Sequence, residues 1–522
     1  MSRLFLDTIQ NALPSDLLYP TNLPQIAESV VRREFQRNAL AEILTKQARS
    51  YGCDAASMES IDRLRDPRSV VAIAGQQAGW FGGPLLSLTK ALAVAKAAKF
   101  WSAKFGFPVV PVFWIAADDH DLDEIRSATL LNRSGQLLRV QYPNDNSNCS
   151  AGESVLSDSD AVLACCTSFN EAIGTGEFTE WVARELSHSY TTGETYATSF
   201  AKLFARITAD TGLVLFSPSD SELKRLALPF FEHLVTRQTE LHGQFQYRTR
   251  MLMSKGYHAQ VEKRSDAAFL FHHTPARQPI SRTNESWTTD SRNWSTAELI
   301  DAIRKNPEQF SPDVISRPLL QSWLFPVIAQ FGGPSEIAYL HQVAPLFETL
   351  SLTRPLHLAR PGVTVIDRRS AELMENSRIS FGRMVSEEPD SLLSSILSDS
   401  FPKEIQQELE NIRADIRLQA SRLSTVGLAV DQQTSDFATQ TAGKIDYLVG
   451  QFAEKLQQAH RRKEKETRER WQKTLNLVAP NNGLQERTIN TLALFAKFGP
   501  KLPELISECI DPDNPDHRLL II

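Results

Sequence analysis

Residues 69–124 constrain the fold more than any other part of the chain, because two short apolar runs there enclose a glycine-rich turn and a long apolar segment. The first run, residues 70–74, is β-branched and apolar, as expected of a strand buried on both faces. A turn with four glycines follows, and Pro84 stands where a helix can begin. The second run, residues 109–117, leads into the acidic cluster DDHD at residues 118–121. This order predicts a strand, a helix and a second strand.

A crossover of this kind is almost always right-handed, which places the two strands side by side in a parallel sheet. The glycine-rich turn and the acidic cluster then meet at the carboxyl edge of the sheet, where open α/β sheets bind ligands. The sequence therefore predicts an α/β fold with a parallel-sheet core, and it predicts the functional site at this edge.

The alternation of strands and helices continues along the chain. Three further apolar runs are strand candidates for the same sheet: residues 213–216, 267–272 and 363–367. Two polar, turn-rich segments, near residues 143–190 and 274–310, interrupt the pattern and are interpreted as inserts. We expect a core of residues 1–388, with one continuous amphipathic helix over residues 23–52.

Residues 389–480 have a different character. Apolar side chains recur there at alternating spacings of three and four in two runs, residues 405–423 and 445–459, which is typical of a coiled-coil seam. The polar segment between the runs, residues 424–435, predicts a turn, so that the two helices pack antiparallel. The remaining residues, 481–522, predict a helical tail that packs back on the core.

Composition narrows the class of protein. The net charge of −6 creates no field that would attract nucleic acid or an anionic membrane surface. The five cysteines show no CxxC pair or zinc spacing, which favours a reducing compartment. No window approaches the roughly 20 apolar residues of a membrane span, and the N-terminus has no signal-peptide pattern. We expect a cytoplasmic protein that acts on small molecules.

The glycine-rich turn is the first candidate site. Glycines let a backbone approach a ligand closely, and unpaired N–H groups at a helix start attract phosphate or carboxylate. Two adjacent glutamines in an apolar context also need hydrogen-bond partners. The turn has neither GxGxxG nor GKS/T, and glycines that serve packing alone are the alternative. The candidate binding residues are Gly75, Gln76, Gln77, Gly79, Gly83 and Pro84.

The acidic cluster is the second candidate, with Asp119, His120 and Asp121 as its proposed functional residues. Several ionisable groups in sequence repel one another unless a cation, a ligand amine or a helix N-terminus offsets them. Helix capping by Asp118 or Asp119 is the alternative. A divalent metal and Mg²⁺ carried by a nucleotide are both compatible with the cluster, and we assign no metal ligand. No GxSxG is present, so serine-based catalysis is not indicated.

A second FGGP sequence, residues 331–334, matches residues 81–84 and also precedes a helical pattern. Glu336 and Tyr339 lie in the first turns of that predicted helix, with Gly333 just before it. A glutamate at such a position favours the helix dipole, which is the simplest explanation. If the two helix starts face each other across the sheet edge, Glu336 lies in the same pocket.

Four segments in order resemble the bacillithiol biosynthesis cysteine-adding enzyme family: AGQQAGWFGGP (74–84), VFWIAADDHDLDEI (112–125), RPLLQSWLFPVIAQFGGPSEIAY (317–339) and NGLQER (482–487). The resemblance implies a Rossmann-like core with connecting inserts and an antiparallel coiled coil that can support a homodimer. It also implies a ligase that joins cysteine to the amine of glucosaminyl-malate, the last step of bacillithiol synthesis.

Formation of an amide from a carboxylate requires an activated acyl group, so ATP is expected, with Mg²⁺ carried by the nucleotide. We expect the turn at residues 75–84, together with Gly333 and Tyr339, to bind phosphate or carboxylate. Asp119 and Asp121 are expected to hold the ammonium group or Mg²⁺, Glu336 to share the catalytic site, and His120 to act as general base. Two alternatives stay open: an ATP-dependent amide ligase or adenylate-forming enzyme for another amine, and a non-catalytic nucleotide-binding coiled-coil scaffold.

Overall fold

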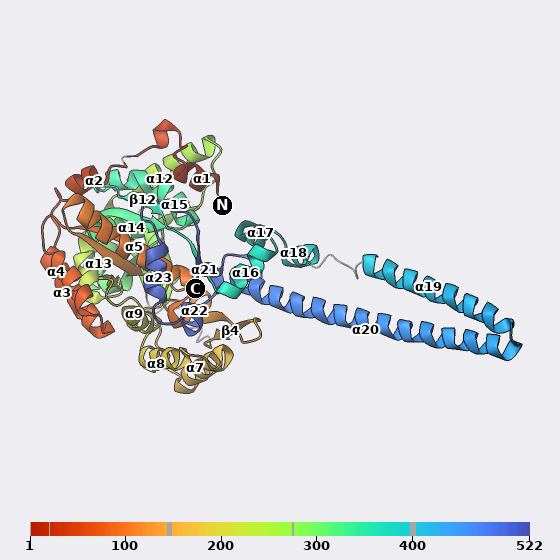
Figure 1. Ribbon diagram of the computed structural model, residues 1–522. Helices are drawn as coiled ribbons and strands as arrows, with labels where there is room; N and C mark the ends of the chain where they lie inside the picture. Colours follow the sequence, from red (N-terminus) through yellow and green to blue (C-terminus); the bar gives the residue numbers. More distant parts are fainter. Residues whose placement is uncertain (1, 20, 144–148, 274–275, 285, 397–402) are drawn as a thin grey trace. The chain divides into compact units, whose positions relative to one another are not determined.

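The computed structural model describes residues 2–19, 21–143, 149–273, 276–284, 286–396 and 403–522. The chain forms two compact units (Figure 1). The first contains the described residues up to Arg133, together with Leu137–Ile366 and Leu484–Ile522, and the second contains Ser134–Gln136 and Asp367–Gly483. The core predicted from the sequence extends to residue 388, whereas in the structure residues 367–388 group with the coiled coil.

A five-stranded parallel sheet forms the centre of the first unit. Its order is β5 (Val214–Phe216), β2 (Val109–Ile115), β1 (Val70–Gln76), β11 (Val327–Gly332) and β12 (Leu356–Ala359). Numbered along the chain, the strands are arranged 3-2-1-4-5, so the order reverses between β1 and β11. The parallel sheet predicted from residues 70–74 and 109–117 is confirmed, and this reversal is a topological switch point where open α/β sheets bind ligands.

The sheet is covered on both faces, which explains why its strands are continuous apolar runs. Every residue of β2 is buried, as are the first five residues of β1. Helix α5 (Leu85–Phe105) begins directly after Pro84, as predicted, and packs against β1 and β2. Helix α15 (Pro334–Thr349) begins at the second glycine-proline turn. Ala74 of β1 lies in register with Phe331 of β11, so the two helix starts leave neighbouring strands at one edge.

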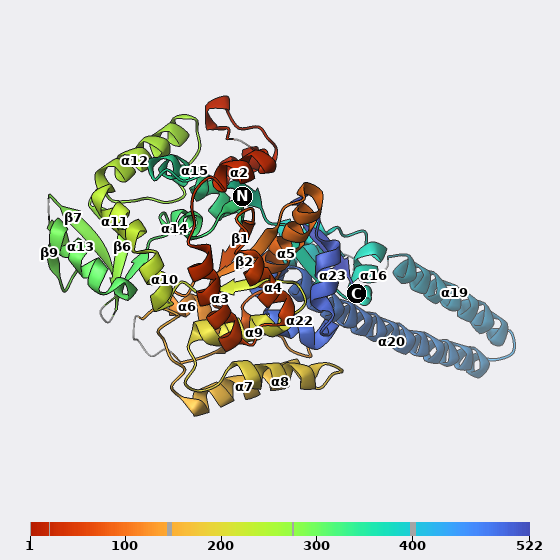
Figure 2. The ribbon, with the colours of Figure 1, turned by 90° about the vertical axis from the view of Figure 1, so that its left-hand side faces the viewer.

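Residues 267–272 do not join the parallel sheet, so that prediction is wrong. They lie in a separate antiparallel sheet (Figure 2), because β6 pairs with the strand that directly follows it along the chain. The order of this sheet is β10 (Phe310–Pro312), β6 (Ala267–His273), β7 (Arg277–Thr283), β8 (Ser286–Thr288) and β9 (Asn293–Ser295), followed in the chain by α13 (Thr296–Lys305). The polar 274–310 segment therefore builds most of a sheet of its own.

Two further expectations, on residues 23–52 and 363–367, differ from the structure. Residues 23–52 form two helices, α2 (Leu23–Val30) and α3 (Arg37–Tyr51), and Arg33 between them donates to the carbonyls of Ser322 and Trp323. The first insert contains α7 (Ser159–Ile173) and α8 (Thr179–Ser189). Strand β13 (Val363–Ile366) pairs with β14 (Arg518–Ile521) instead of joining the parallel sheet.

The other helices and strands of this unit are α1 (Arg3–Ile9), α4 (Ala55–Arg63), α6 (Leu122–Ile125), β3 (Ser127–Leu131), β4 (Leu137–Gln141), α9 (Tyr196–Ile207), α10 (Ser221–Leu226), α11 (Leu228–Thr236), α12 (Gln238–Ser254) and α14 (Arg317–Leu324).

The C-terminal tail belongs to the first unit and carries α21 (Gln485–Thr488), α22 (Thr491–Phe498) and α23 (Leu502–Cys509). It packs on the glycine-rich turn. The Asn490 side chain donates to the carbonyl oxygens of Trp80 and Gly83, at 2.9 and 3.2 Å. The amide of Leu85, the first residue of α5, donates to the carbonyl of Ile489. The tail therefore satisfies backbone groups at the start of α5.

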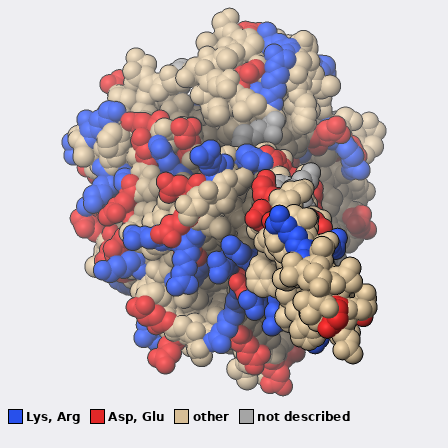
Figure 3. Space-filling model, turned by 45° about the vertical axis from the view of Figure 1, so that its right-hand side comes forward, with Lys and Arg blue, Asp and Glu red and all other residues tan. Residues whose placement is uncertain are grey.

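The second unit contains α16 (Arg368–Asn376), α17 (Phe381–Ser386), α18 (Pro389–Ile396), α19 (Lys403–Leu428) and α20 (Gln432–Val478). The two long helices pack against each other, with Ser424 bonded to Ser435 near the turn and Arg413 beside Asp446 further along. These paired positions run in opposite directions, so the predicted antiparallel coiled coil is confirmed. Among the described residues, no helix combines the length and apolarity needed to span a membrane. Figure 3 shows basic and acidic side chains interspersed on the visible face.

Candidate functional site

A cavity of about 340 Å³ opens at the switch point, at the carboxyl ends of β1 and β11. We call it the switch-point cavity. Both ends of the predicted site contribute to it, and so do residues from α14, the segment after β12 and the tail. Its polar lining residues are Gln76, Gln77, Lys90, Asp119, Glu124, Arg317, Gln321, Gln330, Ser335, Glu336, Tyr339, Arg360 and Arg487, with Gly75 and Gly333 among the others.

An ion pair between Lys90 and Glu336 lines this cavity. The Lys90 ammonium is 2.5 Å from the Glu336 carboxylate and also donates to the Gly75 carbonyl and the Gln76 side chain, both at 2.9 Å. The Gly333 amide donates to the same Glu336 oxygen at 2.7 Å. Burial favours the neutral carboxyl, but Lys90 and this amide outweigh it and hold the pKa of Glu336 below its ordinary value. Burial lowers the pKa of Lys90.

Three arginines add positive charge to the cavity. Arg360 is already paired with Glu486 at 2.7 Å, and both side chains are buried. The guanidinium of Arg317 donates to the Tyr339 hydroxyl; burial acts against its charge, but Tyr339 and the nearby carboxylates raise the pKa of Arg317. Arg487 is exposed and forms no ion pair with any residue that the structure describes. Arg317 and Arg487 are therefore the cations available to an anionic ligand.

Asp119 faces the cavity from the segment after β2. Gln77 donates to its Oδ2 at 3.0 Å and to Glu124 at 2.8 Å, and the amide of Asp121 donates to its Oδ1 at 3.3 Å. Burial acts to raise the pKa of Asp119, but these hydrogen bonds and nearby arginines outweigh it, so the pKa is lowered. Asp119 is therefore an ionised carboxylate that can accept from a bound amine.

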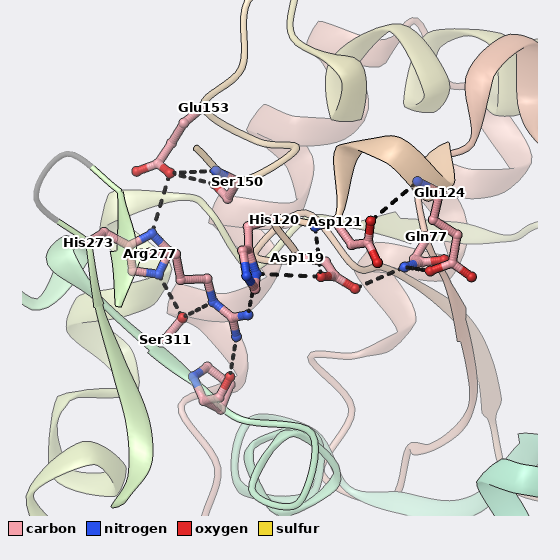
Figure 4. Close-up of polar contacts among 11 residues, drawn as sticks. Gln77, Asp119, His120, Asp121, Glu124, Ser150, Glu153, His273, Arg277 and Ser311 are labelled. Carbon is pink, nitrogen blue, oxygen red and sulfur yellow. Dashed lines mark hydrogen bonds and ion pairs between the residues drawn. The ribbon is translucent and has the colours of Figure 1, made fainter. Parts of the chain in front are cut away.

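His120 points away from Gln77 and contacts Arg277 of β7 (Figure 4). Nη1 of Arg277 lies 3.2 Å from Nδ1 of His120, whereas Oδ1 of Asp119 is 3.9 Å from the same nitrogen. Burial and Arg277 lower the pKa of His120, against the opposing effect of Asp119 and Asp121. His120 is therefore neutral near pH 7, and its Nδ1 lone pair accepts from Arg277.

A second cavity, of about 380 Å³, lies between this edge of the parallel sheet and the antiparallel sheet. We call it the inter-sheet cavity. Apolar side chains such as Phe271 and Ile315 line it together with Arg277 and Lys263. It shares Trp114, Ala116, Asp119 and Arg317 with the switch-point cavity. Two ligands bound in these cavities would therefore meet at the Asp119 carboxylate and the Arg317 guanidinium.

The other two aspartates of the acidic cluster have structural partners. Asp121 caps α6 by accepting from the Glu124 amide, whereas the cap was expected at Asp118 or Asp119. Asp118 accepts two hydrogen bonds from the buried ammonium of Lys224, each at 3.0 Å. Asp121 lines neither cavity, and neither does His120, which adjoins the inter-sheet cavity through its contact with Arg277. The structure therefore separates Asp119, at the junction of the cavities, from Asp121, although the sequence predicts that both hold the ammonium group or Mg²⁺.

Part of the glycine-rich turn lies away from both cavities. Gly75, Gln76 and Gln77 line the switch-point cavity, but Gly79, Gly83 and Pro84 do not. A side chain on Gly79 would come within 2.7 Å of the Gly83 Cα, and Gly83 has φ +67°. These glycines therefore permit close backbone packing beneath the tail, which is the alternative that the sequence left open.

Sequence reasoning did not select Lys90, Arg277, Arg317, Arg360 or Arg487. The sequence could have indicated two of them. Lys90 is the only charged residue in the first eleven residues of α5, and Arg317 is the first residue of one of the four motif segments. Arg277 lies in a segment interpreted as an insert and has no such signal. Among the described residues, no group of three or more His, Cys, Asp or Glu side chains is arranged to hold a metal ion.

Two family models match this chain. The bacillithiol biosynthesis BshC N-terminal Rossmann-like domain matches residues 16–361, and the BshC C-terminal coiled-coil domain matches residues 363–522. The chain belongs to the BshC family of bacillithiol biosynthesis. The resemblance drawn from the four motif segments is thereby confirmed, and so is the fold class of a Rossmann-like core with a C-terminal coiled coil.

Relatives of similar length carry the name "Putative cysteine ligase BshC". The protein from Koribacter versatilis is 29% identical and covers 99% of this chain and 97% of its own length. Those from Salinibacter ruber and Geobacillus kaustophilus are 26% and 27% identical, covering 98% and 94% of this chain and 94% and 91% of their own lengths. A solved structure titled as a putative arginyl tRNA synthetase from Campylobacter jejuni is 10% identical and covers 87% of this chain and 97% of its own, with a TM-score of 0.23.

Proposed function

We propose that this protein is a ligase that joins cysteine to the amine of glucosaminyl-malate, the last step of bacillithiol biosynthesis. Family membership and the names of its relatives support the reaction class. The observation that carries the proposal is the pair of cavities that share Asp119 and Arg317 at the switch point. Ligation needs two substrates to meet, and this junction offers a carboxylate for an amine and a guanidinium for an acyl oxygen.

The charges of the switch-point cavity favour an anionic ligand. Glu336 and Glu486 already neutralise Lys90 and Arg360, whereas Arg317 and Arg487 form no ion pair with a carboxylate of the part of the chain that the structure describes. Arginine suits the planar geometry of carboxylate and the oxygens of phosphate. We assign a carboxylate or phosphate group of a substrate to this cavity, with the amine nearer Asp119.

ATP is part of the proposal because the carboxylate needs activation. The residues present fit its phosphates in one place, since Arg317, Arg487 and Ser335, which lies in the first turn of α15, all line the switch-point cavity. The start of α5 fits less well, because the Leu85 amide is already bonded to the tail. When bound, ATP would supply the leaving group that makes the acyl carbon electrophilic. Mg²⁺ would then arrive with the nucleotide.

His120 is the proposed acceptor of the proton that the attacking amine loses. Its neutral state near pH 7 suits this role. Its Nδ1 is occupied by Arg277 in the free protein, so the lone pair becomes available when Arg277 turns to another partner, such as a substrate carboxylate. Asp119 beside it holds the ammonium group before attack.

Incubation of the purified protein with cysteine, glucosaminyl-malate and ATP tests this proposal. We expect bacillithiol by mass spectrometry, with one ATP cleaved for each product. If a different amine gives product and glucosaminyl-malate gives none, the proposed substrate would be wrong, whereas the proposed amide-ligase chemistry would stand. If neither product nor ATP cleavage is detected, the result would contradict a ligase and favour the scaffold alternative.

We also propose a homodimer that forms through the coiled coil. Large apolar side chains are exposed along the hairpin, among them Val430 at 77%, Phe437 at 68% and Leu423 at 62%. Side chains of α19 and α20 together line an apolar cavity of about 640 Å³. A second copy would bury this surface. None of the five cysteines, all of which lie in the described residues, forms a disulfide, which supports our proposal of a cytoplasmic location.

A further inference from the structure

A chain of hydrogen bonds leads from Glu153 to the proposed base (Figure 4). Glu153 lies 3.3 Å from Nδ1 of His273, and Nε2 of His273 lies 2.7 Å from the Ser311 hydroxyl. Nε of Arg277 donates to that hydroxyl oxygen at 3.2 Å, and Nη1 of Arg277 reaches His120 at 3.2 Å. These hydrogen bonds join a loop, three strands of the antiparallel sheet and the segment after β2.

The direction of each hydrogen bond follows from what its groups can donate. Arginine only donates, so Ser311 and His120 both accept from Arg277. The Ser311 proton is then free to go to Nε2 of His273, whose Nδ1 proton goes to Glu153. The Glu153 carboxylate is ionised, because hydrogen bonds from His273 and Ser150 outweigh burial and lower its pKa to about 2. Every donor in the chain therefore has an acceptor.

The arrangement resembles a serine-histidine-acid triad, but Ser311 is not placed to act as a nucleophile. Its residue is 0% exposed, and its oxygen already accepts from Arg277. His273 is 6% exposed, and neither residue lines a cavity that borders Asp119. Arg277 does line the inter-sheet cavity and is held further by the Pro312 carbonyl at 3.0 Å and the face of Phe271 at 3.8 Å. The hydrogen-bonded residues Glu153, His273 and Ser311 therefore affect the site only through Arg277.

We propose that Glu153, His273 and Ser311 are positioning residues that hold Arg277 against His120 and thereby fix neutral His120 with its proton on Nε2. In the free protein Nδ1 of His120 is therefore an acceptor that is already occupied. A ligand that draws Arg277 away releases this lone pair next to Asp119. The tautomer does not depend on the identity of the substrates, whereas its catalytic use rests on the proposed function.

Nitrogen-15 NMR of the full-length protein, labelled at histidine, tests the tautomer directly. A His120→Gln protein identifies the His120 signals. In the wild type we expect the shift of a protonated Nε2 and an unprotonated Nδ1. In Ser311→Ala, Arg277 loses one anchor, and we expect the His120 shifts to move toward a mixture of tautomers. Unchanged shifts in Ser311→Ala, or a protonated Nδ1 in the wild type, would overturn the proposal.

Matched variants separate positioning from a loss of structure. Ser154→Ala removes another buried hydroxyl, one that has no hydrogen-bond partner among the described residues, and should leave the His120 signals unchanged. Glu153→Gln keeps an acceptor for His273 and should preserve the wild-type tautomer, whereas Glu153→Leu should not. In an Arg277→Met background, Ser311→Ala should have no further effect. An additional effect there would show a route that bypasses Arg277 and would contradict the proposal.

Kinetics provide a second readout. With Arg277 loosened, we expect kcat in Ser311→Ala to fall about tenfold, with KM for cysteine changed less. A wild type without ligase activity would contradict the proposed function but would leave the tautomer measurement decisive. Full kcat in Ser311→Ala, together with an altered tautomer, would overturn the catalytic part of this inference alone.

Discussion

The Lys90 ammonium lies 2.5 Å from the Glu336 carboxylate, although the two residues are 246 positions apart in the sequence. Lys90 comes from the helix after β1, and Glu336 comes from the helix after β11. The pair therefore joins the two halves of the sheet at the point where the strand order reverses. It also fixes part of the wall of the switch-point cavity, since both side chains line it.

Replacement of Lys90 by methionine should destabilise the protein by about 3 kcal/mol, because it leaves a largely buried carboxylate without its cation. The side chains of Lys90 and Glu336 are only 2% and 29% exposed, so water compensates little. Urea unfolding measures the loss. The double variant Lys90→Met/Glu336→Leu should recover part of it, and a double variant less stable than Lys90→Met would contradict this account.

Acid should weaken this ion pair in a defined direction. The native pKa of Glu336 is lowered, so its charge contributes stability above the ordinary value of 4.5, and that contribution is lost as the pH falls through the lower native value. We expect the difference in unfolding free energy between wild type and Glu336→Gln to be constant above about pH 5 and to shrink in more acidic buffer. If this difference stays the same down to about pH 3, the charge of Glu336 does not contribute to the free energy of unfolding.

The sequence predicted the parts of the site that depend on local pattern. Strands β1 and β2 are continuous apolar runs, and each of the two helices after a glycine-proline turn begins where Pro84 or Pro334 stands. Both strand ends and Glu336 could therefore be placed at one edge. Gln77 and Asp119 follow from the order of elements, whereas Glu336 was expected beside them only if the two helix starts face each other; the structure shows that all three line one cavity.

Other parts of the site could not be predicted, because they depend on which elements meet. An isolated apolar strand such as β6 carries no signal of its pairing partner, and it was assigned to the wrong sheet. Arg277 reaches His120 only because β6 and β7 form a separate antiparallel sheet. Likewise, Gly83 has the same local features whether it serves a ligand or packs beneath Asn490.

Asp119 and Asp121 should respond differently to removal of their charge. Asp119→Asn removes the carboxylate shared by both cavities, and we expect kcat/KM to fall on the order of 100-fold with stability nearly unchanged. Asp121→Ala removes the cap of α6 and should cost about 1 kcal/mol of stability while activity stays near wild type. Steady-state rates and thermal unfolding of both proteins check this. Equal losses of activity would mean that the two aspartates share one role.

Arg487 should contribute to affinity without contributing to stability. It is exposed and has no ion-pair partner among the described residues, so Arg487→Gln should leave the unfolding midpoint unchanged. We expect KM for the anionic substrate to rise about tenfold, and added salt to reduce the difference from wild type. Arg360→Gln is the matched comparison, because it breaks the buried pair with Glu486 and should cost about 3 kcal/mol of stability. A normal KM in Arg487→Gln would remove this residue from the site.

The exposed apolar surface of the coiled coil should control the oligomeric state. Val430→Glu and Phe437→Glu place a charge on side chains that are 77% and 68% exposed within one chain, so the hairpin itself should keep its helix content. Buried in a dimer, each charge would be costly. We expect light scattering to give the mass of a dimer for the wild type and of a monomer for both variants. Gln433→Glu adds the same charge outside the apolar cavity and should stay dimeric. A monomeric wild type, or dimers in both charged variants, would show that the hairpin satisfies its apolar pattern without a second copy.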